Sequence, residues 1–152
     1  MKVYPENALS QLEFDKIITI LLNYCQTTIG KEMVNDIRIH THLKYIQTAL
    51  QQTQEFKYIR SAGQYFPTDF VMDIRRDLKL LGIPGAQLVG EQWLLVRRLA
   101  DHTSQVFKWF DAERQSAYAA LYEIVADSYY EKCIIEMIDV VVDERGSVKD
   151  NA

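Results

Sequence analysis

Hydrophobic positions recur every three or four residues along most of the chain, and this spacing is typical of amphipathic helices. The clearest case is a predicted helix over residues 14–25, whose start can be capped by Asn7 or Ser10. We expect its apolar stripe to face a core, with Leu21 near the centre. Gly30 interrupts the pattern, and a short helical stretch follows. The stripe consists of Phe14, Ile17, Ile18, Leu21, Leu22 and Cys25.

Two further helices are predicted in the next part of the chain. One begins near Thr41, which can act as its N-cap, and ends in the Ser-Ala-Gly segment 61–63. A connector around Pro67 follows, and another helix occupies about residues 70–81, where Gly82 and the residues after it stop it. The positions of the first helix that step by three or four are Leu43, Ile46, Leu50, Thr53, Phe56 and Ile59.

The longest predicted helix runs from about residue 90 to residue 111. One of its faces steps alternately by three and four residues, so it should pack against a neighbouring helix. Shorter helices at about residues 117–128 and 130–138 complete the set. The face consists of Val96, Leu99, Thr103, Val106 and Phe110.

The last part of the chain favours extended structure. Three consecutive valines, residues 140–142, precede a turn at residues 143–146, and Val148 follows. This pattern predicts a small β-hairpin in which Gly146 has a positive φ. We therefore expect residues 1–152 to form a single all-α domain, mostly a helical bundle, with a small C-terminal β-hairpin. The end just after that hairpin suggests a segment of a longer protein.

Charge and composition narrow the function classes. The net charge is −4, whereas a module that binds a phosphate backbone is usually basic, so the chain is not expected to bind nucleic acid alone. No apolar run approaches the roughly 20 residues of a membrane span, and no export signal is present, so we expect no membrane contact and a cytoplasmic location. Cys25 and Cys133 are widely spaced and predicted to be reduced core residues.

The segment 85–90 has the glycine spacing of a phosphate-binding P-loop, but the residues after it are not those that bind phosphate and magnesium. The two following positions should be lysine and a serine or threonine, and they are Glu91 and Gln92. A carboxylate there would repel phosphate. The segment therefore predicts a turn that leads into a helix, and no cofactor-binding residue is expected in this chain.

The histidines and carboxylates do not form a clear metal-binding or catalytic pattern either. His40 and His42 could ligate zinc but need a third ligand, and His102 is far along the sequence, so an exposed loop is favoured over a metal site. Asp73 and Asp77 lie one helical turn apart among basic residues, which is typical of a solvated face with ion pairs rather than of acid–base catalysis. No context groups a nucleophile with a base. Catalytic and metal residues are thus predicted to be absent.

Two surface hypotheses stay open at this stage. One is a basic patch, although the sequence does not tell whether its two groups share a face; any nucleic-acid contacts are therefore unknown. The other is a docking surface at Trp93 or Trp109, because four aromatic residues of the longest helix cannot all face one core; packing against loops is the alternative. The basic patch would consist of Arg75, Arg76, Lys79, Arg97 and Arg98.

Four stretches, in order and at compatible spacing, resemble the second bacterial branch of the MutS family, which lacks the mismatch-reading first domain of the mismatch-repair proteins. The resemblance fails at Gly90, Glu91 and Gln92, where the family often has proline and then glutamates, and at the 140–142 valines, where Ile-Asp is usual. The stretches are LEFDKIITILLNYCQTTIGKEMV, LQQTQEF (50–56), DIRRDLKLLGIPGAQLVGEQWLLVRRL, and VVVDERGSVKDNA with the family's hairpin pattern.

The resemblance implies a role as the N-terminal core segment of a longer protein. In this family the chain continues through a lever helix and a clamp to an ATPase domain, which uses ATP and magnesium and supplies most of the homodimer contact. Such proteins act on branched or mismatched DNA or suppress recombination. No residue here matches the ATP-binding motifs, so the segment is expected to be a non-catalytic scaffold. The alternative is a free-standing helical protein-interaction module, and an unrecognised hydrolase has the least support.

Overall fold

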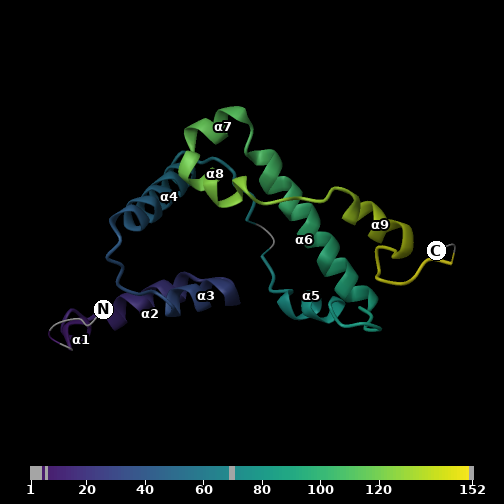
Figure 1. Cartoon of the computed structure of the whole chain (residues 1–152), viewed down its shortest axis with the longest axis horizontal. Helices are drawn as coiled ribbons and strands as arrows, with labels where there is room; N and C mark the ends of the chain where they lie inside the picture. Colours follow the sequence, from purple (N-terminus) through teal and green to yellow (C-terminus); the bar gives the residue numbers. More distant parts are fainter. Residues whose placement is uncertain (1–4, 6, 69–70, 151–152) are drawn as a thin grey trace. The chain divides into compact units, whose positions relative to one another are not determined.

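The computed structural model describes residues 5, 7–68 and 71–150, and contacts within the chain divide it into two compact units, residues 1–39 and residues 40–152. The first unit contains α1 (Ala8–Gln11), α2 (Phe14–Tyr24) and α3 (Thr28–Asn35), shown in purple to blue in Figure 1. The predicted first helix is confirmed to within one residue by α2. That residues 1–152 act as a single domain stays a prediction.

The starts of the first helices differ from the prediction. Asn7 precedes α1 without a side-chain hydrogen bond, Ser10 lies within α1, and α2 follows Glu13, whose φ of 54° is left-handed. Gly30 does not interrupt a helix, since it lies inside α3. The cap there is Thr27, whose hydroxyl oxygen accepts a hydrogen bond from the Gly30 N–H at 3.0 Å.

The expectation that the α2 stripe is buried is wrong. Leu21 is 38% exposed and Ile17 is 49% exposed, and no described residue of α1, α2 or α3 is buried. The physical reason is the small size of the unit, because within it α2 packs against the short helices α1 and α3. Helical periodicity indicated the apolar face but not what covers it.

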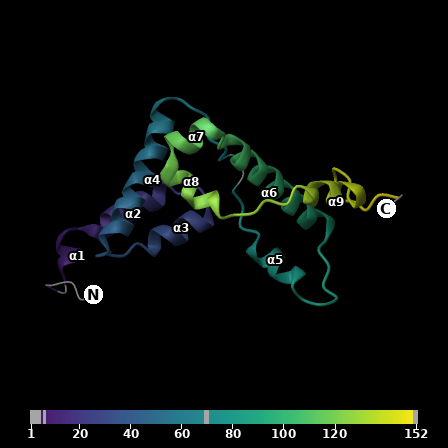
Figure 2. The same ribbon diagram turned by 45° about the horizontal axis from the view of Figure 1, so that its top comes forward.

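The second unit contains α4 (Leu43–Ser61), α5 (Arg75–Leu81), α6 (Gly90–Trp109), α7 (Ala112–Ala117), α8 (Ala119–Ala126) and α9 (Cys133–Val141). Figures 1 and 2 show α8 beside α4 and α9 beside α6, which agrees with the closest packing contacts between helices of this unit. The long predicted helices are confirmed by α4 and α6, and the two shorter ones after residue 117 by α8 and α9, with shifted ends.

Two predicted helix starts in this unit are wrong. The N-cap of α4 is His42 rather than Thr41, and it makes no capping side-chain bond. The next helix begins at Arg75 rather than near residue 70, and residues 69–70 lie outside the described residues. Asp73 explains the late start, because its Oδ1 accepts a hydrogen bond from the Arg75 N–H at 3.1 Å just before the first turn.

An aromatic core joins the end of α4 to the end of α6 and the start of α8. Ile59 is fully buried, and Trp109 is 8% exposed with its ring stacked on Tyr118 at a centroid distance of 5.6 Å. The indole Nε1 donates to the Tyr65 carbonyl oxygen at 2.6 Å. Trp109 is therefore a core residue and not a docking surface, whereas Trp93 is half-buried. Phe110 completes the buried cluster, and the side chains packed on it are Phe66, Val106, Leu121, Tyr122 and Val125.

The predicted C-terminal β-hairpin is wrong, because the described residues contain helices and no strand. Val140 and Val141 belong to the last turn of α9, where the helix continues through their β-branched side chains. Only an isolated antiparallel bridge between Val142 and Val148 remains, and a single pair does not make a strand. The turn itself is present, and Gly146 has the predicted positive φ, 82°.

The cysteine prediction is wrong in part. Both thiols are free, as expected, but Cys25 is half-buried and Cys133 is exposed, so Cys133 is not a core residue. Within the described ranges, none of the helices has the length and apolar character needed to cross a membrane.

Candidate functional site

Two of the family-like stretches meet around the start of α6, where α6 contacts α5 and the turn after α9. At the start of α6, the Gln92 side chain makes two bonds: its Oε1 accepts from the Val89 N–H at 2.9 Å, and its Nε2 donates to Asp77 Oδ1 at 2.6 Å. Gln92 thus caps its own helix and ties α6 to α5. The Gly85–Gly90 segment is a turn that leads into α6, as predicted, and Gly85 has a φ of 81°.

The backbone of Gly90 lies directly against the backbone of Gly146. A Cβ atom at position 90 would overlap the Gly146 carbonyl oxygen, and one at position 146 would lie 3.0 Å from the Gly90 carbonyl carbon. The turn that presents Gly146 is held by Asp143, whose Oδ1 accepts from the N–H groups of Ser147 and Arg145, each at 2.8 Å. These bonds, that of Ser147 first, lower the pKa of Asp143.

An ion pair links α6 to α9. The Arg97 guanidinium donates twice to Asp139, from Nε at 2.5 Å and from Nη2 at 2.8 Å. This bidentate bond lowers the pKa of Asp139 and raises that of Arg97. Lys149 adds a third tie, because its ammonium donates to the Asp139 carbonyl oxygen at 2.5 Å. The pair is half-exposed, so its main effect is to fix the geometry of the two helices.

The surface around this ion pair is hollowed but carries mixed charge. Its cations are Arg97, Arg98 and Lys149, and they are outnumbered by four carboxylates. Since phosphate binding requires uncompensated positive charge, this hollow does not provide a phosphate site. The carboxylates are Glu91, Asp139, Asp143 and Glu144.

Three residues of the predicted ion-pair face, Asp73, Arg75 and Asp77, have local side-chain partners. Arg75 donates from Nε to Asp73 Oδ1 at 2.8 Å and pairs with Asp73 Oδ2 at 2.5 Å. The side-chain hydrogen bond from Arg75 is the main reason why the pKa of Asp73 falls to about 2. Asp77 bonds Gln92 instead. The two carboxylates therefore have different partners, and the geometry does not bring them together as an acid–base pair.

Glu55, in the family-like Thr-x-Glu stretch, joins α4 to the N-terminus of α8. Its carboxylate is almost fully buried, at 8% exposure, and accepts from the N–H groups of Leu121 at 2.9 Å and Ala120 at 3.4 Å. Gln51 donates to the same carboxylate, and Gln52 donates to the Ala120 carbonyl oxygen, both at 3.1 Å. A buried carboxylate is favourable here because it meets the free N–H groups and the positive dipole end of a helix.

Sequence reasoning did not find this role of Glu55. Helical periodicity placed Leu50, Thr53 and Phe56 on the inward face of α4, yet Leu50 is 64% exposed and Phe56 is 37% exposed. Ile59 is buried as the periodicity predicted, and the other buried residue of α4 is Glu55, which contacts α8. The only sequence signal was the family-like Thr-x-Glu pattern, since a glutamate in a helix is ordinarily a solvent-facing residue.

The histidines lie in different surroundings. The His40 ring is 4.3 Å from that of Tyr45, His42 precedes α4, and His102 lies within α6. Within residues 5, 7–68 and 71–150, no three His, Cys, Asp or Glu side chains gather in a way that could hold a metal ion.

Comparison with known proteins gives consistent matches. The chain is 30% identical over 95% of its length to "Endonuclease MutS2" of Latilactobacillus sakei, and 26% identical over 97% to the protein of that name from Halothermothrix orenii. Over 52% of the chain, identity to the MutS2 of Caldanaerobacter subterraneus reaches 39%. No protein-family model and no solved structure matches.

These matches relate the chain to the MutS-related proteins, as the sequence stretches indicated. Within that family its relatives are MutS2 proteins. The similarity extends over nearly the whole chain, which spans only 18–19% of the length of the first two relatives.

Proposed function

We propose that this chain is a non-catalytic scaffold segment of a MutS2-type, ATP-dependent DNA-binding protein of the cytoplasm. The observation that carries the proposal is the match of almost the entire chain to about a fifth of each full-length relative. In this proposal the remainder of such a protein supplies the lever, the clamp, the ATPase with its ATP and magnesium, and the homodimer contact. The protein acts in mismatch repair or in recombination control.

The contacts between segments support a structural role. Glu55 holds α4 against α8, Gln92 holds α6 against α5, and Gly90 packs against the turn that follows α9. Close packing of this kind lets a small shift at one end of a helical segment reach the other. A scaffold between an ATPase and a DNA clamp requires this property.

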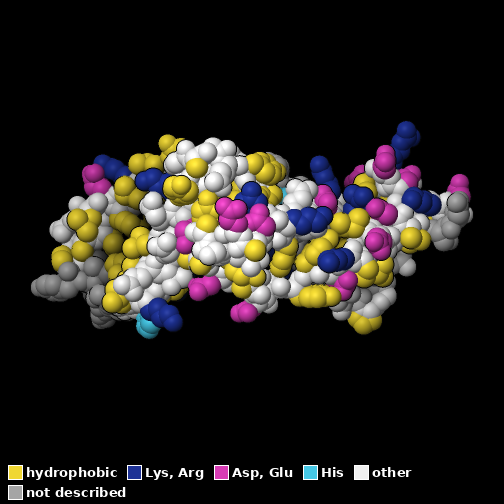
Figure 3. Space-filling view, turned by 90° about the horizontal axis from the view of Figure 1, so that it is seen from above, with side chains coloured by type: hydrophobic (Ala, Val, Ile, Leu, Met, Phe, Trp, Pro, Cys, Tyr) yellow, Lys and Arg dark blue, Asp and Glu magenta, His cyan; other side chains and the backbone are white. Residues whose placement is uncertain are grey.

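Exposed apolar side chains support packing against further protein. On α9, Met137 and Val140 lie on one helical face and are 65% and 67% exposed, and the α2 stripe is open as described above. Figure 3 shows hydrophobic side chains at the surface between the charged ones. Neighbouring exposed apolar side chains such as Met137 and Val140 can pack against a protein surface that covers them.

The first test asks whether the chain alone has the activities assigned to the remainder. We expect no ATP hydrolysis, no saturable ATP binding by calorimetry, and no structure-selective binding of a four-way DNA junction over plain duplex at physiological salt. The physical reasons are the carboxylate at Glu91 and the net charge of −4. Tight junction binding that Arg75→Glu abolishes would contradict the scaffold role.

The second test measures the proposed association directly. The Latilactobacillus sakei MutS2 is prepared without the segment that aligns with this chain, and the two are mixed and analysed by analytical ultracentrifugation. We expect a complex that Met137→Glu with Val140→Glu weakens, and that Glu123→Gln, an exposed change on α8, leaves unaltered. Absence of any complex, with both proteins folded by circular dichroism, would contradict the proposal.

A further inference from the structure

A small hollow lies between the C-terminal half of α6 and the segment that precedes α9. Its volume is about 430 Å³, and it is distinct from the mixed-charge hollow around Arg97. Phe107 of α6 and Tyr130 form part of its wall, with their rings stacked at an interplanar angle of 28° and a centroid distance of 6.1 Å. The remaining lining residues are Ser104, Lys108 and Lys132.

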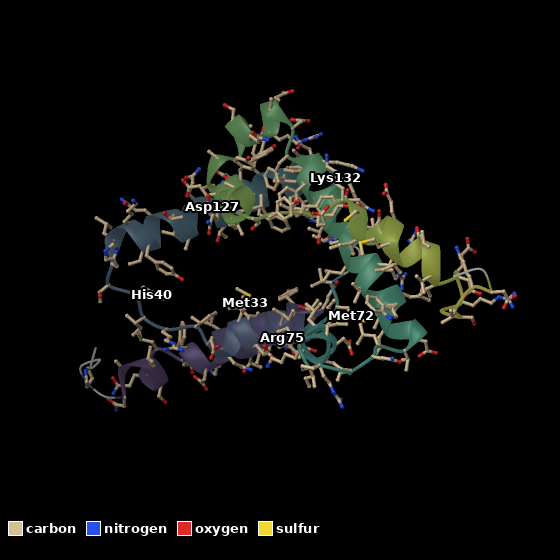
Figure 4. All side chains as sticks on the ribbon, turned by 45° about the vertical axis from the view of Figure 1, so that its right-hand side comes forward. Met33, His40, Met72, Arg75, Asp127 and Lys132 are labelled. Atoms are coloured by element: carbon tan, nitrogen blue, oxygen red, sulfur yellow. The ribbon has the colours of Figure 1, made fainter. Side chains whose placement is uncertain are left out.

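Two ammonium groups lie at the rim of this hollow without a local counter-ion. Lys108 and Lys132 are exposed, and neither ammonium group forms an ion pair or a hydrogen bond with another described residue. Figure 4 labels Lys132 beside the α6 ribbon. The carboxylate next to it in sequence, Glu131, is engaged elsewhere, because it accepts from the Tyr129 hydroxyl at 2.7 Å and from the Cys133 N–H at 3.2 Å. The hollow thus presents positive charge in a chain of net charge −4.

Ser104 supplies a hydroxyl group to the wall of the hollow. The residue is 6% exposed, and its hydroxyl forms no hydrogen bond with another described residue, yet the oxygen is not sealed from solvent. Its neighbour Thr103 behaves in the ordinary way, since its hydroxyl donates to the Leu99 carbonyl oxygen at 2.8 Å. Because this hydroxyl is accessible and bonds no backbone carbonyl, it can donate to an acceptor that enters the hollow.

We propose that this hollow binds an acidic peptide segment of a protein partner. A carboxylate of the segment lies between Lys108 and Lys132 and accepts a hydrogen bond from the Ser104 hydroxyl. A neighbouring apolar side chain packs against Phe107 and Tyr130. A peptide fits better than a nucleic acid, because two lysines neutralise few phosphates and the hollow has room for one or two side chains only.

The probe is a fluorescein-labelled peptide with an Asp-Asp-Phe core flanked by glycine and serine, titrated with the full chain and followed by fluorescence polarisation. Matched peptides carry Asn-Asn-Phe or Asp-Asp-Gly cores. We expect saturable binding of the first peptide and much weaker binding of the other two. This pattern separates recognition of the carboxylates from recognition of the apolar side chain.

Variants of the chain locate the binding. Lys108→Glu and Lys132→Glu should each weaken binding roughly twofold to fivefold, as removal of a partly exposed ion pair does. Ser104→Ala should weaken it without loss of the circular dichroism signal. Lys57→Glu, an exposed change on α4, is the matched charge control and should have no effect.

Three results would overturn the inference. They are equal binding of the Asn-Asn-Phe peptide, affinity unchanged by both lysine substitutions, and preference for a single-stranded oligothymidine that uses the same lysines, which would make the hollow a nucleic-acid site. If a glutamate variant fails to fold, the same binding titration is made with Lys108→Gln and Lys132→Gln, and unchanged affinity in both would overturn the inference. Association with the truncated MutS2 is measured separately, so failure here leaves the scaffold proposal standing.

Discussion

The first residue of α6, Gly90, packs backbone to backbone against Gly146, the left-handed residue of the turn that follows α9. Two segments more than fifty residues apart in the sequence therefore meet where neither can carry a side chain. Gly90 is also a position at which the sequence differs from its family pattern. The pairing explains why a glycine stands there.

Substitution of Gly90 tests this contact. Gly90→Ala should lower the free energy of unfolding by about 1–3 kcal/mol, since the new Cβ forces the turn away from α6. The measurement is a urea unfolding curve followed by circular dichroism. Gly82→Ala is the control, because a Cβ there meets only the Lys79 carbonyl oxygen at an ordinary 3.4 Å, and its midpoint should stay near that of wild type. Equal midpoints for the two variants would show that the contact does not constrain the fold.

Glu55 should be important for stability because its carboxylate, on α4, accepts hydrogen bonds from N–H groups at the start of α8. Glu55→Gln keeps the shape but removes the charge that faces two N–H groups, and we expect a loss of roughly 1–2 kcal/mol in urea unfolding. Glu123→Gln removes an exposed charge from α8 itself and should change stability by no more than about 0.5 kcal/mol. A Glu55→Gln protein as stable as wild type would contradict the capping role.

The Arg97–Asp139 ion pair should make stability depend on pH in one direction. The pKa of Asp139 is lowered in the folded chain, so its contribution is fully present above the ordinary value of 3.8 and is lost as pH falls through the folded value. Asp139→Asn should thus cost about 0.2–1 kcal/mol near neutral pH, a modest amount because the pair is half-exposed. The difference from wild type should shrink in strongly acidic buffer. A difference that grows on acidification would reverse the assigned sign.

The two units should respond differently to loss of an apolar side chain. Ile59→Ala removes a fully buried side chain and should cost about 2–5 kcal/mol. Leu21→Ala, although central in a well-formed amphipathic stripe, removes a side chain that is 38% exposed and should cost clearly less, roughly 1 kcal/mol or below. Thermal unfolding of both variants is the comparison. Equal losses would show that the α2 face is covered in solution, for instance by a second copy of the chain.

The sequence by itself determined the local structure of this protein and its family. Periodicity was sufficient for α2 and α6, since a long apolar repeat depends only on the geometry of one helix. The family stretches were sufficient for the relationship to MutS2, which the relatives confirm. The turn at Gly146 followed from its local residues.

Only the tertiary structure decided which face of each helix is buried and which contacts the polar side chains form. Glu55 is buried because the start of α8, distant in the sequence, brings two N–H groups to it. Trp109 is buried because Tyr118 and the Tyr65 carbonyl oxygen surround it, whereas Leu21 is exposed because its unit lacks a covering layer. Val140 and Val141 stay helical because α9 continues through them, and only Val142 forms a bridge, with Val148 of the same chain. The burial of Glu55 and Trp109 depends on contacts between segments far apart in the sequence, and local residue patterns do not specify such contacts.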